Sequence, residues 1–457
     1  MISYLDRLRA LNRNAWLYLT ANSIQAIAAG ALAVIYTLYL SALGYSAGFI
    51  GFTLFVATIG GGIGIVPSQP LVNRFGWRAM LIWSDLIGGF AIFLQLVLPV
   101  PPVLLVTSVA LGASVAIVLV INAPFLAANS APRDRTTLFG LNNALQFLAS
   151  IIGSLLGGFL PDWFASSAVR GSALLQTLSP LLVPGEQARA YQLALLVIGG
   201  LATPSIIPVL FLRESPTGAE LAVGEILQPW RERLSILWAR VWTAARGVIG
   251  RFGRFQILLG FGAGLWFPYF SIYLVQHLGA SAFDYGKLTA MATVLLAVAS
   301  LLAAPISDRF GKAPTIVIAH LCALPFLALM GLVPVVGVIS VAYLLRGFLA
   351  NIPGPPLQAY LMEAVSERER VVANGVYNVS WQIAWAIGAF AGGLIVGPLG
   401  YQAPMLVAVP FYGGAALLFG WFFLRNPPAY DHHHAGHEIK LRGAETAHPA
   451  SESTTGQ

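Results

Sequence analysis

The sequence predicts an all-α membrane protein in which twelve transmembrane helices form two six-helix bundles related by a parallel repeat. Two observations carry this prediction. Of the 457 residues, 57% are hydrophobic and 9% are charged, whereas a soluble globular chain carries about 25% charged residues. Segments far apart in the chain also repeat one another at a fixed offset. A disordered chain is excluded, because disordered chains are rich in charge and poor in aromatic residues.

Long stretches without a charged residue place the helices of the first half. No Asp, Glu, Lys or Arg occurs over 14–73 or 86–132, and a spanning helix needs roughly 20 apolar residues. Turns at Leu43–Ser46 and Pro99–Pro102 divide these stretches. We therefore predict helices over 15–40, 47–72, 79–99, 103–128, 138–160 and 191–212.

The second half divides in the same way. Its longest charge-free stretch covers 371–424 and is broken by the turn Gly397–Gly400. Each apolar run is apolar on all sides, whereas the strands of a membrane barrel would alternate polar and apolar residues. We predict helices over 255–276, 283–305, 313–333, 335–361, 372–396 and 403–424. Pro268 and the cluster 353–356 should break two of them and could act as hinges.

Positively charged residues orient the helices. Of the 25 Lys and Arg residues, 21 fall in the chain ends or in loops on one side, and such residues favour the cytoplasmic face of a membrane. We therefore expect a multi-pass protein of the cell (inner) membrane with both termini in the cytoplasm. Anionic lipid headgroups account for the net charge of +7, so we do not expect nucleic acid as a partner.

These predictions divide the chain into five parts. We expect a cytoplasmic N-terminal segment, a first bundle, a basic cytoplasmic linker with an amphipathic helix, a second bundle and a disordered cytoplasmic tail. Their boundaries are 1–14, 15–212, 213–254, 255–424 and 425–457.

The two halves repeat one another. Arg74-Phe75-Gly76 recurs as Arg309-Phe310-Gly311. The same spacing carries 133–158 onto 368–393, and these two segments share nine identities in 26 positions without a gap. Because six spans precede the linker, both halves have the same orientation, which makes the repeat parallel.

Two copies of one loop sequence carry a family resemblance. The loop 70–78 reads Pro-Leu-Val-Asn-Arg-Phe-Gly-Trp-Arg, and its second copy covers 305–312. With the twelve helices, the repeat and the long central loop, the sequence over 10–425 resembles the major facilitator superfamily, in particular its bacterial drug and metabolite efflux branch. The resemblance implies two bundles that rock around a central site, so that access alternates between the two sides of the membrane.

The resemblance assigns the two loops to the cytoplasmic gate. Gly76 and Gly311 supply the backbone freedom of a tight turn, and an acid beside the start of a facing helix is attracted by the helix dipole. The family has Asp where this chain has Asn73, so we expect Asp308 to supply the charged latch. The predicted gating residues are Asn73, Arg74, Gly76, Asp308, Arg309 and Gly311. The alternative is that both loops are tight turns without a gating role.

The candidate binding site consists of polar and aromatic residues on helices that face the cavity in the resembled family. These residues are Asn22, Gln25, Gln146, Trp266, Tyr269, Asn378, Trp381, Gln382 and Trp385. Amides and aromatic rings suit an amphipathic organic molecule. The alternative is hydrogen bonding between helices, which we expect for about half of the set.

One cation joins this candidate site. Arg346 lies about eleven residues into the tenth helix, and an ionisable residue inside a membrane costs roughly 2.5–3.5 kcal/mol, which favours a function. Its guanidinium could bind a substrate carboxylate or phosphate, or pair with a titrating acid. The alternative is a structural role beside the backbone carbonyls of the broken segment 351–356.

Two more ionisable residues lie inside predicted helices. Asp85 and His320 occupy equivalent positions of the repeat. Asp85 is the candidate for proton coupling, and the alternative for both residues is a structural hydrogen bond. The fifth helix carries the glycines of the family's antiporter signature over 153–158 but lacks its proline. Close helix packing explains the same glycines.

Together these features predict a secondary active transporter that moves a small amphipathic organic solute outward by alternating access, with protons as the candidate coupling ion. The alternatives are uptake of a small anionic metabolite through Arg346 and, in another class, a membrane sensor on a transporter frame. The single cysteine, Cys322, excludes a cysteine metal cluster. Because the sequence shows no phosphate loop or nucleophile constellation, we predict no enzymatic activity, no cofactor and no metal. The expected partners are the solute and the lipid bilayer, and the expected state is a monomer.

Overall fold

The computed structural model describes residues 11–130, 134–166, 182–213, 247–367 and 369–425. Within these ranges, twelve helices are long and apolar enough to cross a membrane. The prediction of a twelve-helix, all-α membrane protein is confirmed. The predicted amphipathic helix of the linker, within 214–246, and the predicted disorder of the tail from 426 onward lie outside the described residues.

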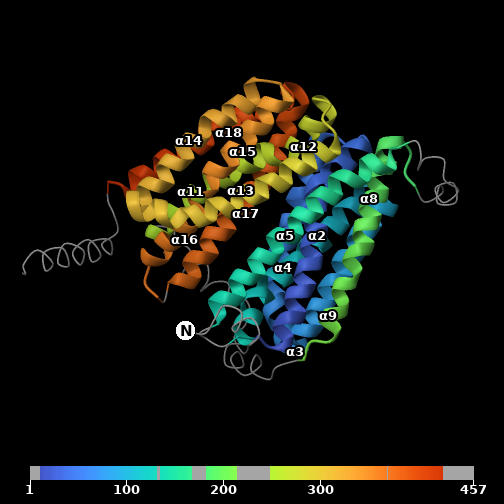
Figure 1. Cartoon of the computed structure of the whole chain (residues 1–457), viewed down its shortest axis with the longest axis horizontal. Coiled ribbons are helices and arrows are strands. Elements are labelled where there is room, and N and C mark those ends of the chain that lie inside the picture. The colour runs from blue at the N-terminus through green and yellow to red at the C-terminus, as the bar shows by residue number, and fades with distance from the viewer. Residues whose placement is uncertain (1–10, 131–133, 167–181, 214–246, 368, 426–457) are drawn as a thin grey trace, which may run out of the picture.

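Six spans form the first bundle (Figure 1). Its elements are α2 (Arg13–Ala42), α3 (Ala47–Val97), α4 (Pro101–Ala128), α5 (Arg135–Phe164), α8 (Glu186–Ala202), the 3-10 turn η2 (Thr203–Ser205) and α9 (Ile206–Leu210). Element α3 contains the second and third spans, which meet at Gly76, where φ is 81°. The sixth span runs from α8 through α9. Asn12 begins the first span because its side chain accepts the Ala15 N–H at 2.7 Å, which satisfies a donor that the helix start leaves unpaired.

Six further spans form the second bundle. Its elements are α11 (Val248–Trp266), η5 (Phe267–Tyr269), α12 (Phe270–Ile272), η6 (Tyr273–His277), α13 (Ala282–Phe310), α14 (Lys312–Leu332), α15 (Val336–Asn351), α16 (Gly354–Glu363), α17 (Arg370–Leu399) and α18 (Ala403–Phe423). The predicted breaks are confirmed: the seventh span leaves α-helical geometry at Phe267–Tyr269, and the tenth is interrupted between α15 and α16. Proline explains both, since it lacks the N–H that an α-helix needs.

The seventh span begins at Val248 rather than at the predicted residue 255. The charges of Arg251 and Arg254 favour a loop before residue 255. In the structure both guanidinium groups lie over the ring of Phe422, 5.6 and 6.0 Å from its centroid. A long arginine side chain can cover apolar surface while its charge stays near water. The charged residues therefore extend the helix instead of ending it.

The repeat is visible in how the helices pack inside each bundle. A Cβ on Gly30 of α2 would overlap the carbonyl oxygen of Ser150 on α5, and a Cβ on Gly264 of α11 would overlap that of Trp385 on α17. These two contacts occupy equivalent places in the two halves. Gly153 and Gly388 stand in the same relation to Ile27 and Phe261. Glycine lets the two backbones touch in both bundles.

The two bundles meet at one end and separate at the other (Figure 1). At the closed end α3 packs along α17 and α5 packs along α13. Hydrogen bonds join the bundles there: the hydroxyl oxygens of Thr37 and Ser271 lie 2.8 Å apart, and the Ser41 hydroxyl donates to Gln276 at 2.6 Å. The bundles diverge toward the opposite end, at which α2 begins.

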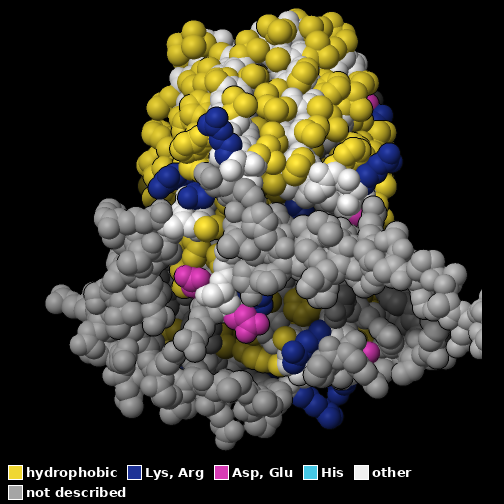
Figure 2. Space-filling model, turned by 90° about the vertical axis from the view of Figure 1, so that its left-hand side faces the viewer, with side chains coloured by type: hydrophobic (Ala, Val, Ile, Leu, Met, Phe, Trp, Pro, Cys, Tyr) yellow, Lys and Arg dark blue, Asp and Glu magenta, His cyan; other side chains and the backbone are white. Residues whose placement is uncertain are grey.

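The open end is also the basic end. Helices α2, α5 and α17 begin there with Arg13, Arg135 and Arg370, and α13 ends there beside Arg309. Figure 2 views the molecule from the left-hand side of Figure 1 and shows Lys, Arg, Asp and Glu side chains along and below the lower edge of a largely hydrophobic upper body. Most of the described cations therefore gather on one face, as the charge pattern of the sequence predicts, while Lys287 lies at the other end and Arg346 inside a span.

Candidate functional site

Four glycines close one end of the space between the bundles. Gly51 of α3 meets the Ala389 carbonyl of α17, and Gly286 of α13 lies against Gly158 of α5. A Cβ on Gly286 would approach the Ser154 carbonyl oxygen of α5 to 2.5 Å, closer than real side chains pack. Gly393 of α17 is the repeat mate of Gly158 and meets the Ala47 backbone of α3. Because backbone touches backbone along both interfaces, this end is shut to a solute.

Tyr269 fills the same closed end from the broken part of the seventh span. Its side chain is 1% exposed, and its hydroxyl donates to the Ala389 carbonyl, beside Gly51 and Gly393. The break at Pro268 places it there. Predicted as a binding residue, Tyr269 lies in the closed gate in this conformation.

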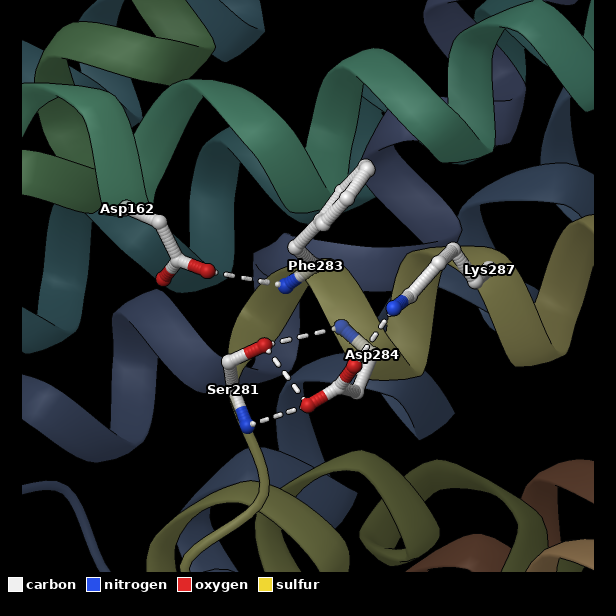
Figure 3. A network of polar contacts seen from close by, with 5 residues as sticks. All are labelled: Asp162, Ser281, Phe283, Asp284 and Lys287. Atoms are coloured by element: carbon white, nitrogen blue, oxygen red, sulfur yellow. Dashed lines mark hydrogen bonds and ion pairs between the residues drawn. The ribbon is translucent and has the colours of Figure 1, made fainter.

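A charged contact spans the bundles at the closed end (Figure 3). The Asp162 carboxylate of α5 accepts the Phe283 N–H in the first turn of α13 at 3.1 Å. The same turn carries a capping box between Ser281 and Asp284, and Lys287 pairs with Asp284 at 2.7 Å. A carboxylate at a helix start interacts favourably with unpaired N–H groups and with the helix dipole. Asp162 therefore holds the two bundles together at this end.

The predicted gating loops lie at the open end, one in each bundle. Gly76 has φ 81° and ψ 165°, and Gly311 has φ 85° and ψ 151°. Residues other than glycine rarely adopt backbone angles in this region. Arg74 and Arg309 lie over the rings of Phe75 and Phe310, 5.3 and 5.6 Å from the centroids.

The acidic member of these loops is accessible in this conformation. Asp308 is exposed, and no hydrogen bond or ion pair joins it to another described residue. Asn73, at the equivalent position in the first loop, is half-buried. This arrangement fits a latch that is released while its end of the protein is open. The gating role stays a prediction.

The eleventh span presents the aromatic part of the candidate site. The rings of Trp381 and Trp385 stack, with centroids 6.4 Å apart and planes 18° apart, and both side chains are half-buried. Asn378 and Gln382 on the same helix are exposed, and the Asn378 amide donates to Asn374 at 2.9 Å. Gln146 of α5 is half-buried.

The polar residues of the first bundle bind one another. The Gln25 amide donates to Asp85 at 3.1 Å and to Ser205 at 2.9 Å. The Asn22 amide donates to Asn142 at 3.1 Å. In this conformation the amides of Asn22 and Gln25 therefore link helices, which is the alternative to substrate binding that the sequence left open. Asp85 is a half-buried carboxylate held by one amide, which leaves it oxygen lone pairs for a proton.

Arg346 of α15 lies in an aromatic setting in the second bundle. Its guanidinium carbon is 4.7 Å from the ring centroid of Trp266 on α11 and 4.7 Å from that of Tyr412 on α18. The side chain is half-buried. Among the described residues, no carboxylate lies within ion-pair distance of it. The site thus contains an arginine held by two aromatic rings.

Two other ionisable residues have structural partners. His320, the repeat mate of Asp85, is buried, and its Nδ1 lies 2.8 Å from the Ile316 carbonyl oxygen of its own helix. Its ring meets Phe255 edge to face. Glu363 pairs with Lys312 at 2.5 Å. Within the described part of the chain, no group of three His, Cys, Asp or Glu side chains could hold a metal ion.

The structure has twelve spans in two repeated bundles. The bundles are closed at one end and apart at the other, and polar and aromatic side chains lie on their helices. This arrangement defines a membrane transport protein.

The chain belongs to the Major Facilitator Superfamily. The model of that family matches residues 18–261 and 254–450, which together span most of the chain. The protein is therefore a multi-pass membrane transporter and not an enzyme.

The proteins similar to the chain include two resistance proteins and a solved nucleoside transporter. The tetracycline resistance protein, class C, of Escherichia coli is 26% identical over 152 residues, which cover 33% of this chain and 38% of that protein. The methylenomycin A resistance protein of Bacillus subtilis (strain 168) is 26% identical over 324 residues, 64% of this chain and 68% of that protein. The crystal structure of the nucleoside transporter NupG (D323A mutant) superposes with a TM-score of 0.71 at 13% identity, covering 90% of this chain and all of that one. This structural likeness concerns the fold alone.

The sequence analysis did not identify Asp162, Tyr412 or the glycine pair Gly51 and Gly286. Asp162 and Tyr412 gave no local signal, because their contacts come from helices distant in the chain. Gly51 and Gly286 did give a signal, since they occupy equivalent positions of the repeat.

Proposed function

We propose that the protein exports a small amphipathic organic solute by alternating access, with protons as the coupling ion. The observation that supports this most is the asymmetric meeting of two repeated bundles, tight at one end and apart at the other. The names of both relatives, which are resistance proteins, favour the outward direction. The positive charge of the open end favours a cytoplasmic location for it and for both termini, in the inner membrane.

In this mechanism the two ends exchange contacts. The glycine interfaces and Asp162 hold the outer end closed while Asp308 is exposed. When the bundles rock, the outer contacts part, and Asp308 reaches the start of a facing helix on the cytoplasmic side. A solute bound near Trp381 and Trp385 is then exposed to the other side. A two-state equilibrium of this kind shifts by the difference in contact energy between its states.

Transport by purified protein in liposomes tests the proposal. Tetracycline, ethidium and 1-naphthoate, which are a zwitterion, a cation and a carboxylate, should be screened for movement driven by an imposed pH gradient. We expect transport of at least one compound, reduced by Trp381→Ala. Trp421→Ala serves as control, because Trp421 of α18 is 56% exposed and is not part of the candidate site. Absence of movement for all three compounds would contradict the proposed export.

A second candidate function is the uptake of a small anionic metabolite. The observation that favours it is Arg346, a cation inside a span with no carboxylate partner among the described residues. Inhibition of inward flux by carboxylates, lost in Arg346→Gln, would support uptake over export.

A further inference from the structure

Arg346 is a cation inside the second bundle, and its surroundings indicate what kind of group it can bind. Arg346 is the eleventh residue of α15, on a span of 28 residues, so it lies well inside the membrane. Its charge is stabilised by the faces of two rings, at 4.7 Å each, and such contacts favour a desolvated cation.

The rings satisfy the charge of Arg346 but not its hydrogen-bonding groups. A guanidinium has five N–H donors arranged as a planar fork. No hydrogen bond joins these donors to another described residue, and the half-buried side chain stays accessible. A fork of donors inside a membrane protein, without an acceptor from the described residues, is suited to a bidentate carboxylate.

A second unused donor lies on one of the two rings. Trp266 is 1% exposed, and its indole Nε1–H is buried without a hydrogen-bond partner among the described residues. Most buried donors of this kind are paired. The orphan donor is carried by the ring against which Arg346 packs, so both donors belong to the same place in the second bundle.

We infer that Arg346 and Trp266 form a subsite for a carboxylate group of the transported solute. The inference rests on the proposed function and narrows its substrate class to an amphipathic molecule with one carboxylate. The guanidinium fork takes both carboxylate oxygens, and the indole N–H adds a third hydrogen bond. A phosphate shares this chemistry, and the experiment separates the two.

Binding to the full-length purified protein tests the subsite with three matched probes: benzoate, its neutral analogue benzamide, and phenyl phosphate. We expect benzoate to bind at least about tenfold more tightly than benzamide, because a hydrogen bond to a charged group is worth that much. Equal affinity of benzoate and benzamide, or no binding of either, would overturn the inference. Tighter binding of phenyl phosphate would overturn the choice of carboxylate.

Variants assign the binding to the two residues. Arg346→Gln should reduce benzoate affinity at least about tenfold and leave benzamide affinity unchanged. Arg251→Gln is the matched control, since Arg251 also lies over a ring, that of Phe422, but at the open end of α11. Trp266→Phe keeps an aromatic face but removes the N–H together with part of the ring system, so it should weaken benzoate binding about threefold or more, and thermal unfolding checks that the variant stays folded. Unchanged benzoate affinity in both Trp266→Phe and Arg346→Gln would refute the assignment.

The subsite and the proposed function fail separately. Transport of the test compounds with benzoate and benzamide bound alike would refute the subsite and leave the transport function intact. Selective benzoate binding by a protein that moves no solute in liposomes would refute the export function and support the subsite.

Discussion

At the scale of single residues, glycines allow the helices of each bundle to pack closely. Gly30 and Gly264 sit where two helices of one bundle touch backbone to backbone. A membrane gives no hydrophobic driving force between helices, so close packing of small residues supplies much of the association. The same residue type at other helical positions, such as Gly337, meets open space. The contribution of a glycine to stability therefore depends on whether a neighbouring backbone touches it.

This difference predicts the effect of adding one methyl group. Gly264→Ala should lower the free energy of unfolding by about 1–3 kcal/mol, because the new Cβ overlaps the Trp385 carbonyl. Gly337→Ala is the control and should be neutral or slightly stabilising, since alanine favours a helix. Thermal unfolding in detergent measures both. Equal melting temperatures for the two variants would contradict the packing argument.

Asp85 makes a second prediction at this scale. Asp85→Asn keeps an oxygen for the Gln25 amide but removes the titrating group. We expect transport driven by a pH gradient to be lost, while exchange of solute between two sides at equal pH continues. Glu367→Gln, a change on an exposed side chain, should leave both activities intact. Gradient-driven transport that survives Asp85→Asn would rule out Asp85 as the proton carrier.

At the scale of elements, the contact between the end of α5 and the start of α13 helps to hold one end closed. Asp162 accepts the Phe283 N–H across the bundle interface, whereas Asp284 pairs with Ser281 and Lys287 of its own bundle. Both acids stand at the same helix start (Figure 3). Asp162 therefore contributes to closing the protein, whereas Asp284 caps the helix.

We expect Asp162→Asn to open the closed end more often. A carboxylate at a helix start is worth roughly 0.3–1 kcal/mol, which is about a two- to fivefold change in the equilibrium. The readout is the labelling rate of Ser271→Cys, a 2% exposed position at the interface, in a Cys322→Ser background with a membrane-impermeant maleimide. Asp284→Asn should leave the rate unchanged. A similar rise in both variants would point to a loosened α13 rather than to a latch.

At the scale of the whole molecule, transport requires the two bundles to part at the end that is closed here. Thr37 and Ser271 face each other across the bundles at 2.8 Å. A disulfide between Thr37→Cys and Ser271→Cys, in a Cys322→Ser background, should therefore stop transport, and reduction should restore it. The control joins Ser84→Cys and Ser114→Cys, which lie within the first bundle, and should permit transport. Full flux through the cross-linked Thr37→Cys, Ser271→Cys protein would disprove rocking of the bundles.

Much of this architecture was predictable because the membrane imposes a simple rule. Every span needs about 20 apolar residues, so the charge-free stretches located all twelve helices. Most predicted ends lie within about four residues of the observed ones. The start of the seventh helix is a clear exception, since Arg251 and Arg254 follow the packing of Phe422 rather than the pattern of charge.

The candidate site was less predictable, because side-chain partners come from distant parts of the chain. The family resemblance implies that Gln25 and Tyr269 lie on helices that face the central cavity. It does not indicate that Gln25 binds Asp85 or that Tyr269 joins the closed gate. The roles of both residues in substrate binding stay predictions.

The sequence by itself determined the class of protein, the number of spans, their common orientation in the two halves and the repeat, because hydrophobic length and charge act locally along the chain. The tertiary structure alone decided which end is closed, which glycines join the bundles, and that Arg346 lies between Trp266 and Tyr412. These features depend on contacts across helices that are far apart in sequence, where the fit of one side chain against another decides the outcome.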